Sequence, residues 1–159
     1  METTLSEGVE QWLAPMADSI DELATCTLGL DGATVEPCGT QVPRGLVGAY
    51  VGLVGDNAAL QLGVIADPAT CAELARALLC MEPEDELSDE DMADAMNEVA
   101  NIVGGGVKRR MVDVDPSLKL GLPVFINGFV QPTHALETAV ATVTLGPYDG
   151  HLLILRHRI

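Results

Sequence analysis

The chain has 159 residues, of which 48% are hydrophobic and 3% aromatic, and it carries a formal net charge of −16. This charge would repel phosphate backbones, and the scarcity of aromatic rings leaves few surfaces on which bases could stack, so the composition argues against nucleic-acid binding. Because no apolar run approaches the ~20 residues that cross a bilayer, and the first residues lack the basic and apolar regions of a secretory signal, we expect a cytoplasmic protein without membrane insertion.

The first half of the chain predicts a long helix, a group of strands and a second helix. In order, we expect a helix near 5–24, a short strand near 24–30, a loop near 37–45, and strands near 46–54 and 58–66. The sequence Gly-Asp-Asn at 55–57 favours a hairpin between the last two strands. Asp67 and Pro68 are typical of the cap and the first position of a helix, which we expect over about 68–81.

The second half predicts another long helix and a further group of strands. Ser88 followed by Asp91 resembles a capping box and sets the start of the helix. Its end is left open, because the three glycines at 104–106 each cost about 1 kcal/mol in a helix interior. We expect strands near 118–130, 138–145 and 151–157, with a hairpin turn at 146–150.

This order of elements predicts the fold class. Helices followed by strands in both halves indicate an α+β domain, in which a largely antiparallel sheet packs against long helices. The length is sufficient for residues 1–159 to form a single domain. Each half runs from a long helix into a closing hairpin, so an internal duplication of the chain is a further expectation.

The cysteines and histidines are not spaced as ligands or redox pairs. No C-x-x-C pair is present among the four cysteines, so we expect reduced thiols, no metal site and no cofactor in this chain. Cys71 and Cys80 fall on the second predicted helix, where we expect them to pack as small hydrophobic side chains.

One face of the third predicted helix carries a polar stripe. Asp94, Glu98 and Asn101 stand at positions i, i+4 and i+7, and at about 100° per residue they share a face with Gly105 and Lys108. The apolar residues fall on the opposite side. On helix geometry alone, the favoured interpretation is the solvated face of an amphipathic helix in an acidic chain. The other interpretation is a surface that is inserted into a second molecule.

The spacing Asp94-x3-Glu98-x2-Asn101-x21-Pro123 resembles the signature of the CheC/CheX/FliY family of chemotaxis phosphatases. A glycine four residues after the asparagine, here Gly105, is also similar to that family's helix. With residue frequencies near one in twenty, four fixed positions match by chance in about a few per thousand chains of this length. The resemblance implies a CheX-like phosphatase domain with a CheC/CheX-like fold.

The first predicted helix repeats only part of this pattern. Asp18 and Glu22 have the same spacing as the two carboxylates, but Thr25 stands in place of the asparagine and Val47 in place of the proline. A second copy of the site would therefore be degraded, which suits CheX-like members with one motif better than CheC-like members with two. The simpler interpretation, which we favour, is that Asp18 and Glu22 face solvent.

The resemblance implies a protein phosphatase that hydrolyses the aspartyl phosphate of a phosphorylated CheY-like receiver domain of a response regulator. In this interpretation Asn101 orients the attacking water, and Glu98 holds a lysine of the receiver. Asp94 supports the polar face, Pro123 fixes a neighbouring turn, and Gly105 lets the partner backbone come close. The Mg2+ ion is expected in the receiver-domain substrate rather than in this chain.

Two alternatives stay open. A domain of the same fold could be a non-catalytic module that binds receivers or takes part in assembly like a flagellar-switch component, and fraying at the glycine triplet would favour this. An unrelated acidic α+β domain with a coincidental motif is the other.

The family resemblance and an exposed strand edge are also compatible with a homodimer. The basic residues 108–110 either meet an acidic partner or complement the end of their helix.

Overall fold

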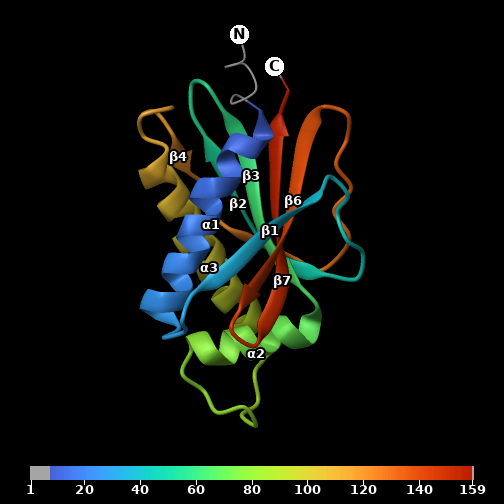
Figure 1. The fold of residues 1–159 in the computed structure, drawn as a ribbon. Helices are drawn as coiled ribbons and strands as arrows, with labels where there is room; N and C mark the ends of the chain where they lie inside the picture. Colours follow the sequence, from blue (N-terminus) through green and yellow to red (C-terminus); the bar gives the residue numbers. More distant parts are fainter. Residues whose placement is uncertain (1–7, 159) are drawn as a thin grey trace.

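The computed structural model describes residues 8–158, which form an antiparallel sheet with helices along one face (Figure 1). The strands are β1 (Ala33–Gly39), β2 (Val47–Val54), β3 (Ala59–Ala66), β4 (Lys119–Leu120), β5 (Val124–Ile126), β6 (Leu136–Leu145) and β7 (Tyr148–His157). The α-helices are α1 (Leu13–Glu22), α2 (Pro68–Leu78) and α3 (Asp89–Arg110). The predicted α+β class is confirmed.

The helices begin where the capping residues place them. The Asp67 carboxylate accepts a hydrogen bond from the Thr70 amide at 2.9 Å, at the start of α2. Ser88 Oγ accepts from the Asp91 amide at 3.0 Å, at the start of α3. Both side chains satisfy amide groups that have no partner inside the first turn of a helix. The predicted starts of α2 and α3 are therefore confirmed.

The sheet is buried on both faces, but by different elements. The face toward the helices holds the main core, into which α1 and its flanking turns contribute Trp12, Met16, Ile20 and Leu23. On the opposite face a smaller apolar cluster forms around Tyr50, Ile65, Val140, Leu153 and Leu155. Loops cover this second cluster, so the central strand β7 is apolar on both sides, as its continuous run of leucine and isoleucine requires.

The sheet order has an internal symmetry. The strands run β1-β6-β7-β3-β2, and β4 and β5 both pair with the outer side of β2. If β1, β2 and β3 exchange places with β5, β6 and β7, the strand order of the sheet is the same when read from the opposite edge. In Figure 1 the corresponding helices α1 and α3 run side by side along the sheet, and α2 lies across its lower end. The topology supports the expected duplication. The first strand of each half pairs with a strand of the other half, β1 with β6 and β5 with β2.

Two local predictions are wrong. Residues 23–27 continue the first helix as a π-helical turn, in which Leu23 and Ala24 are buried in the core and Thr25 Oγ1 donates to the carbonyl of Asp21 at 3.2 Å. The strand comes later, as β1, and it includes Pro37 and Gly39 from the predicted loop. A proline is tolerated there because β1 is an edge strand whose register shifts after Pro37. Residues 5–7 of the predicted first helix lie outside the described residues.

The remaining predictions of strands hold with shifted limits. The hairpin of β2 and β3 is confirmed, with Val54 opposite Ala59, and so is the hairpin of β6 and β7, which turns at Gly146 and Pro147. The apolar strands predicted near 118–130 are the two short strands β4 and β5, which are separated by the connector at 121–123. Within residues 8–158, every helix is too short or too polar to cross a membrane.

A buried carboxylate fastens the β2–β3 hairpin to the segment that follows α3. Asp115 is 1% exposed and accepts hydrogen bonds from the amides of Asn57 and Ser117 and from Ser117 Oγ. Ser117 Oγ in turn accepts from the Asp56 amide at 2.7 Å. These bonds favour the charged carboxylate and hold the pKa of Asp115 below its ordinary value of 3.8.

We expect Asp115 to make stability depend on pH. Because its pKa is lower in the folded than in the unfolded chain, its contribution is complete above the unfolded pKa and is lost as the pH falls below 3.8 toward the folded value. Asp115→Asn should lower the melting temperature near neutral pH, and the gap to wild type should close in acid. Thermal unfolding between about pH 6 and pH 3 checks this. The control is Asp113→Asn at an exposed position, and a gap that stays constant with pH would contradict the expectation.

Candidate functional site on helix α3

Helix α3 carries the predicted stripe on its outer face. Asp94 and Glu98 are exposed and Asn101 is half-buried, while the apolar positions of the helix face the core. Within residues 8–158, these three side chains form no hydrogen bond or ion pair. The structure thus brings Asp94, Glu98, Asn101 and Gly105 together on one face, on which the two carboxylates are exposed and the asparagine and glycine are half-buried.

The glycine triplet does not break the helix, which continues to Arg110. A Cβ atom at Gly104 would lie 2.7 Å from Leu120 Cδ1 and 2.8 Å from Val51 Cγ1, and one at Gly106 would lie 2.9 Å from Ser19 Cβ. These two glycines therefore let α3 approach the sheet and α1 closely. Gly105 has nothing within 4 Å of its Cβ position and belongs to the open face.

Pro123 lies on the connector between β4 and β5. The amide of Gly121 donates to the carbonyl of Gly52 at 2.8 Å, and Val124 pairs with Tyr50, so Pro123 runs beside β2 close to Val51. Since Val51 also faces Gly104, the connector lies along the side of α3 that carries Gly104, one turn after Asn101. Pro123 is half-buried and directly precedes β5.

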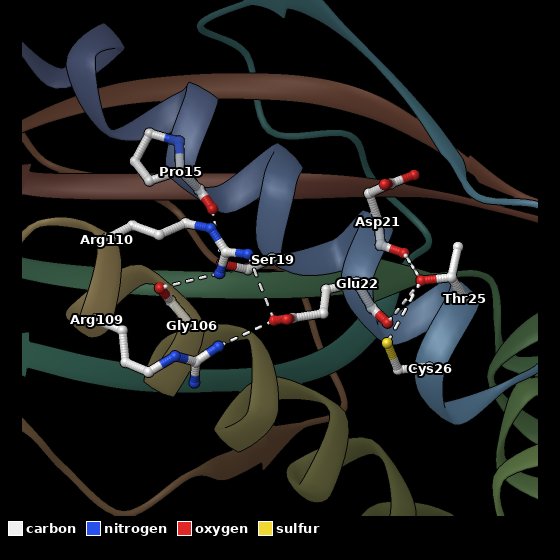
Figure 2. Close-up of polar contacts among 9 residues, drawn as sticks. All are labelled: Pro15, Ser19, Asp21, Glu22, Thr25, Cys26, Gly106, Arg109 and Arg110. Atoms are coloured by element: carbon white, nitrogen blue, oxygen red, sulfur yellow. Dashed lines mark hydrogen bonds and ion pairs between the residues drawn. The ribbon is translucent and has the colours of Figure 1, made fainter.

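The corresponding face of α1 is occupied by internal contacts (Figure 2). Glu22 Oε1 accepts from Arg109 Nη2 at 2.9 Å and from Arg110 Nη2 at 3.4 Å. Arg110 Nη1 also donates to Ser19 Oγ at 3.1 Å. Glu22 is exposed as expected, but it is paired with α3 rather than free in solvent. Two of the three basic residues at the end of α3 are used in this way, and Lys108 stays on the face of the stripe.

The cysteines in the described part of the chain differ in burial. Cys71 lies on the buried side of α2, where burial raises the pKa of its thiol to about 11 and disfavours the thiolate. Cys80 is exposed just after α2, so the expectation that it packs in the core is wrong. No three His, Cys, Asp or Glu side chains within residues 8–158 gather closely enough to hold a metal ion.

Several solved structures share the fold of this chain. Chemotaxis protein CheX from Vibrio vulnificus superposes with a TM-score of 0.74 at 18% identity, covering 92% of this chain and 99% of that one. The CheX-CheY-BeF3-Mg2+ complex from Borrelia burgdorferi gives a TM-score of 0.72 at 20% identity, with 92% and 98% covered. The FliM middle domain from H. pylori gives 0.69 at 12% identity, with 99% and 93% covered. No curated protein sequence matches the chain.

These likenesses place the chain in the class of CheC/CheX-like α+β domains, as the motif predicted. The model of one family matches residues 47–145, a span that includes α3 and Pro123. The chain belongs to the chemotaxis phosphatase CheX family.

The glycine assignments lead to opposite expectations for two neighbouring substitutions. Gly104→Ala should destabilise the fold by about 1–3 kcal/mol, because the added methyl overpacks the contact with Leu120 and Val51. Gly105→Ala should stabilise it by up to about 1 kcal/mol, because the methyl enters open space and alanine favours the helix. Urea unfolding of the two variants checks the expectation. Equal shifts in the same direction would contradict the packing roles.

Proposed function

We propose that this protein hydrolyses the aspartyl phosphate of a phosphorylated CheY-like receiver domain, using the Glu98 and Asn101 face of α3. The observation that carries the proposal is an unbroken helix that presents both side chains outward, unpaired within residues 8–158, in a member of a chemotaxis phosphatase family. Support also comes from the Borrelia burgdorferi relative of the same fold, which is seen as a complex with CheY.

The chemistry asks little of the phosphatase. An aspartyl phosphate is an acyl phosphate and is already activated toward hydrolysis, so the protein needs no nucleophile of its own. Positioning one water in line with the bond that breaks accelerates the reaction. Water oxygen then bonds to phosphorus, the aspartate oxygen leaves, and inorganic phosphate is released.

Asn101 is suited to position this water. Its carbonyl can accept a hydrogen bond from the water while its NH2 group donates to a phosphoryl oxygen. The amide is neutral, so it adds no repulsion against the charged phosphoryl group, whereas a carboxylate at this position would. Asn101 is half-buried and lies within a helix, so the backbone that carries its side chain has a fixed position.

The other residues of the face have supporting roles. Glu98 lies one turn before Asn101 and, in this proposal, pairs with a lysine of the receiver and holds the partner in register. Asp94 shapes the rim, and Pro123 fixes the connector beside the helix. Gly105 leaves open space through which the backbone of the partner can approach. The receiver brings its own Mg2+, so this chain contributes no metal ligand.

The second candidate is a non-catalytic module that binds receivers or takes part in flagellar-switch-like assembly. The observation that favours it is the likeness to the FliM middle domain, which covers nearly the whole chain. The two candidates differ in turnover. A module would bind a phosphorylated receiver and leave its rate of phosphate loss unchanged.

Replacing Asn101 separates the two candidates. Asn101→Ala should lower the acceleration of receiver dephosphorylation by about 100-fold or more, as the loss of one oriented catalytic group does. The measurement follows the decay of phosphorylated receivers from the same genome with wild type, with Asn101→Ala and with no added protein. Asn127→Ala, at an exposed position outside α3, is the matched control. Equal decay with wild type and Asn101→Ala would rule out the catalytic role.

We further expect selectivity for phosphorylated receivers over small phosphate esters. The site has no nucleophile, and the metal and most of the charge that stabilise the reaction belong to the substrate protein. Incubation with p-nitrophenyl phosphate and Mg2+ should therefore release no nitrophenol above the background rate. Steady turnover of this ester that disappears in Asn101→Ala would show that the chain supplies the whole catalytic site.

A further inference from the structure

The polar stripe cannot by itself form the centre of a stable interface. Its face consists of Asp94, Glu98, Asn101, Gly105 and Lys108, with no large apolar side chain. Protein interfaces have a desolvated centre rich in apolar groups, and a few such side chains provide most of the binding energy. A partner that encloses Asn101 must therefore find its apolar contacts beside the stripe.

Most of the exposed large apolar side chains in the described part of the chain lie on the segment that follows α3. Within residues 8–158, the exposed large hydrophobic residues on the segment after α3 are Val112, Val114, Leu122, Val124 and Phe129. Leu122 is the most exposed of them, with 89% of its surface accessible. Val124 lies opposite Tyr50 and so shares the face of the sheet away from α3.

Leu122 lies on the connector between β4 and β5, two residues after Leu120, which faces Gly104 of α3. It lies between Gly121, which is bonded to Gly52 of β2, and Pro123, which precedes β5. The contact of Gly104 with Leu120 and Val51 shows that this side of α3 faces the connector. The hydrogen bond of Gly121 on one side and strand β5 on the other fix the backbone of the connector that carries Leu122.

We propose that Leu122 is an apolar anchor for the receiver domain that the stripe engages. The inference rests on the proposed function for its partner. A standard interface buries about 800 Å2 of each protein, so an interface centred on Asn101 would extend over a neighbouring connector. Lys108 and Val112, which line a hollow at the end of α3, continue the surface in the direction of the helix axis. The receiver is assigned as the occupant because Leu122 follows Leu120, which packs against Gly104 of α3, and the stripe on that helix is the surface that must be enclosed.

The test measures binding and turnover separately. Dissociation constants are determined for wild type, Leu122→Ser and Leu79→Ser with each beryllofluoride-activated receiver domain from the same genome. Leu79 is an exposed leucine at the end of α2 and serves as the matched control. Leu122→Ser should raise the dissociation constant and the half-saturating receiver concentration about tenfold, as the loss of one anchoring side chain does, with the saturated rate kept within about twofold.

Several results would overturn the inference. An unchanged dissociation constant for Leu122→Ser would do so, and so would an equal loss of binding in Leu79→Ser. A change of molecular mass in sedimentation equilibrium without a change in receiver binding would assign the surface to a second copy of this chain. Binding to none of the receivers by wild type would remove the inference together with the proposed function.

The two proposals can fail independently. If Asn101→Ala loses turnover while Leu122→Ser binds like wild type, only the anchor is wrong. If Asn101→Ala hydrolyses as fast as wild type while Leu122→Ser binds weakly, the catalytic role is wrong and the anchor stands. Circular dichroism and melting of Leu122→Ser should match wild type, because the side chain is almost fully exposed.

Discussion

The arrangement of the molecule depends on the close approach of α3 to its neighbours through Gly104 and Gly106. At Gly104 the helix backbone meets side chains of β2 and β4, and at Gly106 it meets Ser19 of α1. Close packing on both sides fixes the rotation of the helix about its axis. That rotation decides which residues face outward, so the packing glycines also orient Glu98 and Asn101.

The two halves of the fold have diverged in how they use equivalent surfaces. The carboxylate of Glu22 on α1 forms ion pairs with two arginines of α3, whereas the carboxylate of Glu98 on α3 has no partner within residues 8–158. The arginines that neutralise the first surface come from the helix that carries the second. Internal pairing therefore ties the two helices together and leaves the polar groups of one face free for a partner.

Much of the fold and the stripe could be predicted because both are local. Ser88 and Asp67 cap their own helices, and the spacing of Glu98 and Asn101 sets their common face. The roles of the glycines could not be predicted, since the contacts of Gly104 come from strands distant in sequence. The comparison of Val47 with Pro123 by their offset along the chain fails because the two residues are not at equivalent places in the fold. Val47 begins β2, which corresponds to β6, while Pro123 precedes β5, which corresponds to β1.

The exchange of first strands between the halves has a consequence for the origin of the fold. The edge strand β1 pairs with β6 of the second half, and β5 pairs with β2 of the first. A chain of half this length would have an unpaired hairpin edge and could complete its sheet only with a second copy. A single-repeat ancestor of this topology would therefore have been an intertwined dimer. Joining its two copies through α2 would have made assembly independent of concentration and allowed each helix face to evolve separately.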